Sequence, residues 1–353
     1  MKKPRSDRKR GSGGRIRLGL IGCGSIAQES HLPAIRKIPE IDLVAVADSD
    51  ESKAQQVGRE YKVAGVYKDY RQLLESGQVD AVDICTPTKY HAEMVIAAAN
   101  LGKHVLCEKP IALHLEEADQ MIQACSKNNV KLMIAHSRRF ISRYSIVKKN
   151  IKERRIGKPV WATQISRRHT IDPNRYTWYF DPKMTYGPIA EVGTHEADLL
   201  RWFFEDEVVE VQGIARSRSP DMPLYEQVFA TLAFRKGGIA SFEVGYCLPK
   251  SYTQYTTLEV LGTAGFITAS DRHMNIVIEG TDGGARYPLA NSVLLSVANA
   301  YRDELIAFAD SVIRNRKPPV TGTDGRSALE IILAVLQSVE QRAAVQLPLL
   351  QAN

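Results

Sequence analysis

The sequence lacks the two features that mark most secreted and membrane proteins, namely paired cysteines and long apolar runs. Only five residues are cysteine, and their spacing suggests neither disulfides nor a bound metal: Cys23, Cys85, Cys107, Cys125 and Cys247. We interpret them as small buried side chains in a reducing compartment. No apolar run approaches the roughly 18 residues of a membrane helix, and the basic N-terminal segment leads into glycines, not into a signal-peptide core. We therefore expect a cytoplasmic protein without membrane contacts.

The body of the chain also lacks an excess of charge, although the whole sequence carries +7. Residues 1–15 contain seven lysines and arginines against one acid, Asp7, and so account for +6 of that total. The remainder is near neutral, which does not favour a nucleic-acid partner. We interpret residues 1–14, which end in a glycine-rich stretch, as a disordered basic tail.

A chain of 353 residues is long for one domain, and two domains are the natural expectation. In the first half, short β-branched runs alternate with amphipathic helical patterns, which predicts right-handed crossovers and a parallel, doubly wound sheet. We expect this domain at residues 15–136 and a second α/β domain at 137–353, with terminal helices that pack back on the first. The expected strands of the first half are 16–21, 41–47, 80–85, 103–107 and 131–135.

The first predicted strand runs directly into the pattern G-x-G-x-x-A at residues 22–27. In a strand–turn–helix context, Gly22 permits the tight turn, Gly24 lets the backbone approach a pyrophosphate, and Ala27 keeps helix and strand in contact. The alternative is an ordinary tight turn. The candidate cofactor-binding residues of this turn are Gly22, Gly24, Ser25, Ile26 and Ala27.

Asp48 ends the second predicted strand, 21 residues past Ala27, where a carboxylate reaches the ribose hydroxyls of a dinucleotide. The same charge repels the 2′-phosphate of NADP, and Ser49 follows where an arginine would favour that phosphate. The pattern therefore favours NAD over NADP. The alternative role for Asp48 is the N-cap of the next helix.

Two later strand ends supply further candidates. The strand at 80–85 ends in Thr86 and Pro87, which can line the nicotinamide end of the cofactor, and His91 opens the next helix, where a structural role is the alternative. The strand at 103–107 ends in Glu108 and Lys109 before Pro110, at the edge where open parallel sheets bind ligands. A surface lysine ahead of a helix is the alternative for Lys109.

The second half holds a polar stripe on a helix expected at 191–204. Glu191, His195 and Asp198 share one face, so that a carboxylate can hold the histidine tautomer. A solvated stripe is the alternative, and a metal site would need a third convergent ligand. A strand at 160–166 delivers Arg168 and His169, and the aromatic loop at 170–188 suits either a sugar or a domain or subunit contact.

Together these motifs resemble the Gfo/Idh/MocA family of glucose–fructose oxidoreductase and inositol dehydrogenase relatives. The similarity rests on residues 22–27, Asp48, 86–88 with His91, 108–110, 138–140, 193–198 and 303–308.

The resemblance implies an N-terminal Rossmann domain, a C-terminal domain with a large open, mainly antiparallel sheet, and a homodimer or homotetramer built through that sheet. It implies hydride transfer between NAD(P) and a sugar or cyclitol, a cis Lys109–Pro110 bond, and Lys109 and His195 facing one substrate carbon. The sequence departs from the family in Glu191, where many relatives have Asp, and in Tyr186-Gly187-Pro188, where many are glycine-rich.

We therefore expect an NAD-dependent sugar or cyclitol dehydrogenase with catalytic residues Lys109, His195 and Glu191. In this hypothesis His195 is the base, Glu191 supports it, and Lys109 stabilises the developing oxyanion or relays the proton. Arg168 and His169 complete the expected substrate-binding set. Two alternatives stay open: a ketoreductase on a nucleotide-linked or amino sugar, whose anion would meet Arg138, Arg167 or Arg168, and a nicotinamide-binding sensor without catalysis.

Overall fold

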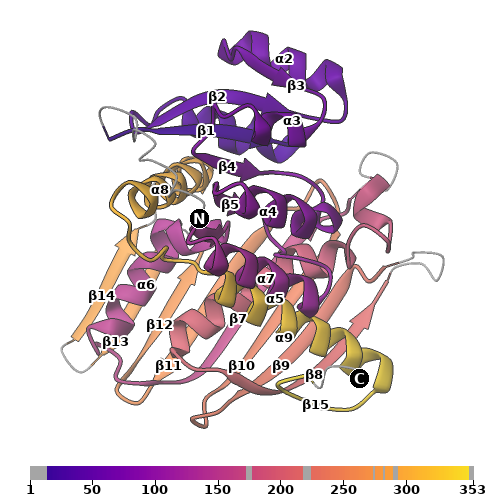
Figure 1. Ribbon diagram of the computed structural model, residues 1–353. Helices are drawn as coiled ribbons and strands as arrows, with labels where there is room; N and C mark the ends of the chain where they lie inside the picture. The colour runs from indigo at the N-terminus through magenta and orange to yellow at the C-terminus, as the bar shows by residue number, and fades with distance from the viewer. Residues whose placement is uncertain are drawn as a thin grey trace.

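The fold consists of two sheets with their helices (Figure 1). The computed structural model describes residues 14–171, 177–217, 224–272, 275–280, 283–288 and 293–349. Residues 1–13 of the predicted tail and part of the aromatic loop at 170–188 lie outside these residues. None of the helices in the described part of the chain is long and apolar enough to cross a membrane.

The first sheet is parallel throughout, with the order β3-β2-β1-β4-β5-β6. Its strands are β1 (Ile16–Ile21), β2 (Ile41–Ala47), β3 (Gly65–Tyr67), β4 (Ala81–Ile84), β5 (His104–Cys107) and β6 (Leu132–Ile134). This confirms the doubly wound prediction. The strand order reverses between β1 and β4, and ligands bind such sheets beyond the strand ends at that reversal.

Short helices connect these strands. They are a π-helical turn (Ala27–His31) continued by α1 (Leu32–Ile35), α2 (Glu51–Tyr61), α3 (Tyr70–Glu75), a 3-10 turn (Thr88–Tyr90), α4 (His91–Asn100) and α5 (Leu115–Lys127). Carboxylates cap two of them, because Asp50 accepts a hydrogen bond from the Ser52 N–H and Asp69 accepts one from the Arg71 N–H.

The second sheet has nine strands in the order β14-β13-β12-β11-β7-β10-β9-β8-β15, and only its β7–β10 pair is parallel. Its strands are β7 (Pro159–His169), β8 (Val208–Arg216), β9 (Gln227–Phe234), β10 (Ile239–Leu248), β11 (Tyr255–Gly262), β12 (Gly265–Ser270), β13 (Asn275–Gly280), β14 (Gly283–Pro288) and β15 (Val345–Gln346). The predicted strand 160–166 is too short, since β7 includes Arg167, Arg168 and His169.

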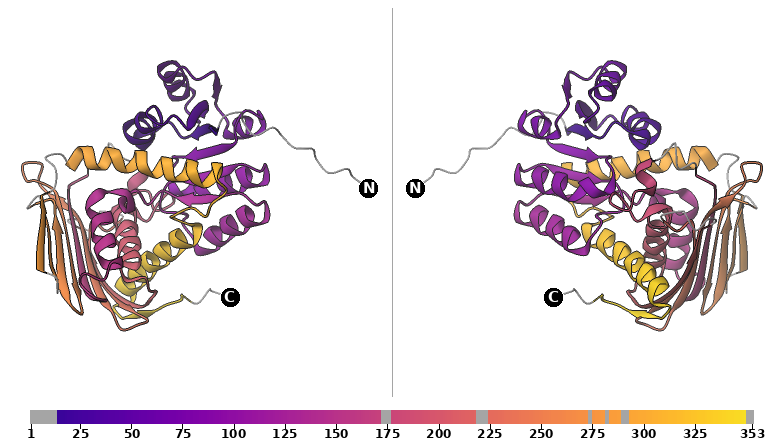
Figure 2. Two further views of the ribbon diagram at one scale, coloured as in Figure 1. Left: turned by 90° about the vertical axis from the view of Figure 1, so that its left-hand side faces the viewer. Right: turned by 90° about the vertical axis from the view of Figure 1, so that its right-hand side faces the viewer.

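Helices cover one face of the second sheet, and the other face stays uncovered by the described elements (Figure 2). The helices of the second half are a 3-10 turn (Ser137–Phe140), α6 (Ser142–Lys152), a second 3-10 turn (Thr177–Phe180), α7 (Gly187–Phe204), α8 (Val293–Ile313) and α9 (Gly322–Gln341), of which α6, α7 and α9 contact the sheet. The predicted start of α7 at Glu191 is four residues late, because Pro188 sits in its first turn. Leu305 and Phe308 of α8 are buried in the core cluster of the first sheet.

Candidate active site

The turn after β1 leaves room above its backbone. Gly22 has φ +96°, and a Cβ there would lie 2.7 Å from the Cys85 carbonyl oxygen, so only glycine fits. A Cβ at Gly24 would meet nothing within 4 Å, which leaves the outer side of the turn open to a ligand. Ser25 is exposed and Ile26 half-buried, whereas Ala27 is fully buried against the sheet. This open cradle fits a dinucleotide pyrophosphate.

Asp48 lies beside this turn. Its carboxylate accepts hydrogen bonds from the Cys23 N–H at 2.7 Å and from the Asp50 N–H at 2.8 Å. The alternative role of Asp48 as a helix N-cap is wrong, because the cap of α2 is Asp50. Asp48 thus joins β2 to the glycine turn, with a negative charge at the sheet edge where a ribose would lie.

His91 holds two strand-end loops together. Its Nδ1 lies 2.8 Å from the Pro110 carbonyl oxygen, and its Nε2 lies 2.9 Å from the Thr86 carbonyl oxygen. Burial lowers the pKa of His91, and these carbonyls only partly oppose that shift. A neutral imidazole donates to one of these carbonyls at a time, but both ring nitrogens face backbone, so His91 positions Thr86 and Pro87 rather than offering a nitrogen to a cofactor.

Glu108 is fixed by a buried ion network that sequence reasoning missed. His31 Nδ1 lies 2.7 Å from an Asp83 carboxylate oxygen, and its Nε2 lies 3.0 Å from a Glu108 carboxylate oxygen. Burial alone would lower the pKa of His31, but the charge and hydrogen bond of Asp83, together with Cys85, outweigh it and raise that pKa well above its ordinary value. The second Glu108 oxygen accepts a hydrogen bond from the Lys109 N–H at 3.0 Å.

One part of this network has the spacing of a possible metal site. The ligand atoms of His31, Asp83 and Cys85 lie within 4.8 Å of one another. However, both nitrogens of His31 are already engaged by carboxylates, and burial raises the pKa of the Cys85 thiol, which disfavours the thiolate that binds metals. We therefore interpret the cluster as a support for the loop that carries Lys109.

Lys109 reaches across to the second half of the chain. Its Nζ donates to a Glu191 carboxylate oxygen at 2.8 Å and to the Glu191 carbonyl at 3.0 Å. Hydroxyls of Thr88 and Thr185 donate to the other carboxylate oxygen at 3.3 and 3.0 Å. Burial would lower the pKa of Lys109, but Glu191 and Glu108 outweigh it and raise that pKa, so the ammonium persists at neutral pH.

The peptide bond between Lys109 and Pro110 is cis, as the resemblance implied. Glu191 does not brace His195 in this structure, because its carboxylate is fully used by Lys109 and the two threonines. The expected pairing of Glu191 with His195 is wrong. Glu191 instead binds Lys109, which is 82 residues away in sequence, although His195 is only one helical turn away.

His195 is buried and neutral. It keeps only 9% of its surface, and its Nδ1 is buried without a hydrogen-bond partner in the part of the chain that the structure describes, which leaves Nε2 as the nitrogen to meet a substrate. Burial, together with the charges of Arg138 and Lys109, lowers the pKa of His195 well below its ordinary value. A neutral imidazole near a fixed ammonium can accept a proton. The fully buried His136, which sequence reasoning missed, packs edge-on against it at 5.8 Å between ring centroids.

Most of the remaining polar candidates are engaged elsewhere. Arg138 pairs with Glu196, and Arg167 donates to both Glu243 carboxylate oxygens at 2.7 and 2.9 Å. His169 Nε2 lies 2.6 Å from the Tyr252 carbonyl oxygen, in the loop before β11. The predicted contact of His169 with substrate stays a prediction.

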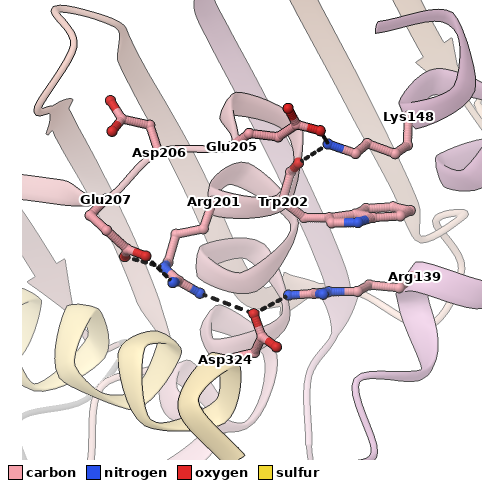
Figure 3. Close-up of a pocket in the computed structure, with 8 residues that line it drawn as sticks. All are labelled: Arg139, Lys148, Arg201, Trp202, Glu205, Asp206, Glu207 and Asp324. Carbon is pink, nitrogen blue, oxygen red and sulfur yellow. Dashed lines mark hydrogen bonds and ion pairs between the residues drawn. The ribbon is translucent and has the colours of Figure 1, made fainter. Parts of the chain in front are cut away.

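Asp198, the third member of the predicted stripe, binds Arg139 through both carboxylate oxygens at 2.6 and 2.7 Å. Figure 3 shows that Arg139 also meets Asp324 and lies on one side of the Trp202 ring, with Lys148 on the other. The charges around this pocket satisfy one another, so it supports the end of α7 rather than a ligand.

Comparisons with known proteins agree with this geometry. A model described as an oxidoreductase family, NAD-binding Rossmann fold, matches residues 16–136, and its companion, described as the C-terminal alpha/beta domain of the same family, matches 148–347. The myo-inositol 2-dehydrogenase of Thermotoga maritima is 30% identical over 344 residues, covering 94% of this chain and 98% of the relative. The scyllo-inositol 2-dehydrogenase (NAD(+)) of Bacillus subtilis is 28% identical over 96% of this chain and 98% of the relative.

A solved structure gives the same result. The myo-inositol 2-dehydrogenase of Lactobacillus plantarum superposes with a TM-score of 0.82 at 27% identity, covering 94% of this chain and 99% of that one. Both family models together span most of the sequence, and the described strand order is that of a Rossmann domain followed by an open sheet. This chain is therefore an NAD-dependent oxidoreductase of the Gfo/Idh/MocA family.

Proposed function

We propose that this protein oxidises a secondary hydroxyl of a cyclitol or sugar, with His195 as the base and Lys109 as the cation that stabilises the developing oxyanion. The observation that carries this proposal is the placement of an ammonium, fixed by Glu191, close enough to His195 for its charge to lower the histidine pKa. Inositol dehydrogenases among the relatives make a cyclitol the first candidate substrate.

The glycine turn at residues 22–27 and Asp48 would hold NAD, which would supply the acceptor for a hydride from the alcohol carbon. The hydroxyl proton moves to Nε2 of His195, which is neutral at the moment of reaction because burial disfavours its charged form. Lys109 keeps its proton and donates a hydrogen bond to the oxygen as negative charge develops there. Loss of the hydride and the proton leaves a ketone, so the reaction balances without a further group.

Glu191 has a different role in this scheme from the one its helical position suggested. By accepting hydrogen bonds from Lys109, Thr88 and Thr185, it holds the ammonium at a fixed place. A fixed donor lowers the barrier more than a mobile one, because little reorganisation is needed during reaction. We therefore assign Glu191 as a positioning residue for Lys109.

We also propose that copies of the chain associate through the uncovered face of the second sheet. Ile214 of β8 and Phe229 of β9 are directly opposite each other and keep 71% and 50% of their surfaces exposed. Ile239 on β10 is also exposed, at 55%. Apolar side chains gathered on an open sheet face favour burial against a second copy. Sedimentation should give a dimer or tetramer, and Phe229→Glu should shift it toward monomer.

A substrate screen tests the proposed activity. Purified protein is incubated with NAD or NADP and with a panel of cyclitols, aldoses, alditols and sugar acids, and reduced cofactor is followed by absorbance. We expect NAD-dependent turnover of at least one cyclitol or sugar, and weak or no turnover with NADP because Asp48 repels its phosphate. Absence of turnover across the whole panel, in both directions, would count against the proposal.

A further inference from the structure

Three arginines near α7 differ in one respect that the proposed function does not explain. Arg138 pairs with Glu196, and Arg167 pairs with Glu243 and with the Tyr255 hydroxyl at 2.7 Å. The side chain of Arg168 makes no hydrogen bond and no ion pair with any residue that the structure describes. It is nevertheless half-buried, and burial, followed by the charge of Arg138, lowers its pKa.

Arg168 lies in the candidate active site. Successive residues of a strand face opposite sides, so Arg168 shares the face of the buried residues Gln164 and Ser166 on β7, and its register partner on β10 is Tyr246. Its charge is among those that lower the pKa of His195. It also acts on Tyr179, whose pKa is raised well above the ordinary value by burial and by Tyr246.

The charges of this site leave one cation uncompensated. Lys109 is matched by Glu191 and Arg138 by Glu196, whereas no carboxylate of the described chain is bonded to Arg168. An unpaired charge that is partly removed from water is unfavourable, and such groups are normally paired or used. A guanidinium presents a planar fork of donors that matches a carboxylate at two points.

We propose that Arg168 binds the carboxylate of an acidic sugar or cyclitol, and that this protein therefore prefers sugar acids to neutral sugars. The inference rests on the proposed function, because it assigns the substrate class of the same site. A carboxylate carries the single charge that one free guanidinium balances, whereas a phosphate carries nearly two. Anchored at Arg168, the acid would present a ring or chain hydroxyl to His195 and Lys109.

Binding to the NADH complex tests this without requiring turnover. Isothermal titration of the protein saturated with NADH is carried out with matched sets of uronates, aldonates, their neutral aldoses or alditols, and the corresponding sugar phosphates. We expect at least one acid to bind about ten- to a hundred-fold more tightly than its neutral counterpart, the range of a charged hydrogen bond. Equal affinities, tighter phosphates, or no binding of any acid would overturn the inference.

Variants assign the preference to one side chain. Arg168→Gln should remove the preference for the acid while leaving the affinity for NADH unchanged, and Arg168→Lys should retain part of it. Arg167→Gln is the matched control, because it removes a charge from the adjacent residue on the opposite face of β7, and it should keep the acid-to-neutral ratio. A ratio unchanged in Arg168→Gln would overturn the inference.

The outcomes also separate this inference from the proposed function. If neutral cyclitols are oxidised with NAD and acids are not preferred, the proposed activity is supported and the proposed role of Arg168 is contradicted. If acids bind through Arg168 but no member of the panel transfers a hydride, the contact between Arg168 and the acid is supported and the proposed activity is contradicted.

Discussion

The Nζ of Lys109, from the loop after β5, lies 2.8 Å from a carboxylate oxygen of Glu191 on α7. This contact joins the parallel sheet of the first half to the helix that covers the second sheet. The lysine side chain keeps 16% of its surface and the glutamate 4%, so the pair is screened from most of the solvent. The position of the proposed catalytic ammonium therefore depends on how the two halves of the chain meet.

Replacing Glu191 should change how Lys109 titrates. In Glu191→Gln the ammonium loses its main stabilising charge while burial persists, so the pKa of Lys109 falls. We expect kcat to decrease and its alkaline limb to move to lower pH, as measured in a pH profile of NADH formation. Glu205→Gln, an exposed partner of Lys148 far from Lys109, is the control. An alkaline limb that stays in place in Glu191→Gln would show that Lys109 does not depend on this pair.

His195 should determine the acid limb of the activity. Its pKa lies well below the ordinary value of 6.5, so kcat/KM should stay level as pH falls through 6.5 and decline only under more acidic conditions, where the imidazole becomes charged. His195→Asn should lower kcat by about 10²–10⁴-fold and abolish that limb. His114→Asn, at the exposed N-cap of α5, serves as the control, since asparagine caps helices well. An acid limb that survives in His195→Asn would assign the base elsewhere.

Variants of two neighbouring aspartates distinguish an effect on cofactor choice from an effect on helix capping. Asp48→Ala should raise the KM for NAD and narrow the preference over NADP, because the charge that opposes the extra phosphate is lost. Asp50→Ala should cost about 1 kcal/mol of stability through loss of the α2 cap and leave the cofactor preference as it was. Steady-state kinetics with both cofactors measure the first effect, and urea unfolding measures the second. If both variants keep the same preference, Asp48 only supports the glycine turn.

Glu304 of α8 should make the fold less stable as pH rises. Both of its carboxylate oxygens are buried without a hydrogen-bond partner among the described residues, and burial, then the charge of Glu108, raises its pKa well above the ordinary value of 4.5. Between pH 4.5 and that raised pKa, the folded state holds a proton that the unfolded state has lost. Stability attributable to Glu304 therefore falls with pH, by up to about 1.4 kcal/mol per pH unit.

Glu304→Gln cannot lose a proton on unfolding, so it should raise the free energy of unfolding by about 1–3 kcal/mol at neutral pH and flatten its pH dependence. Urea unfolding at several pH values measures both effects. Glu60→Gln, on the exposed side of α2, should leave the slope unchanged. Parallel slopes for Glu304→Gln and the unchanged protein would mean that Glu304 is ionised in the folded state.

The local parts of the site were predictable from the sequence. The glycine turn, the position of Asp48 after β2 and the position of Lys109 after β5 follow from patterns of a few residues, because strand ends of a parallel sheet share one edge. Five of the six first-half strands were predicted to within a residue for the same reason, and β3 (Gly65–Tyr67) was not predicted. The open second sheet and the cis bond at Pro110 were predicted from the resemblance to the family, not from local sequence patterns.

The partners of the charged groups were not predictable. Glu191 binds a lysine 82 residues away, and His31 binds Glu108 at a separation of 77, so neither contact leaves a local pattern. For the second sheet the strand at 160–166 was predicted, whereas in β8 and β14 polar residues or glycines interrupt the alternation that would mark a strand. Of Arg138, Arg167 and Arg168, only Arg168 has no carboxylate partner among the described residues, and this became visible only once its neighbours had been paired in three dimensions.

The most direct test of the central claim compares turnover and cofactor binding in Lys109→Ala. The proposed mechanism predicts that kcat falls by about 10²-fold or more, since a preorganised donor to the oxyanion is lost, while the affinity for NAD, measured by fluorescence titration, stays the same. Turnover comparable to that of the unchanged protein, at the same affinity for NAD, would contradict the claim that this ammonium stabilises the reacting oxygen.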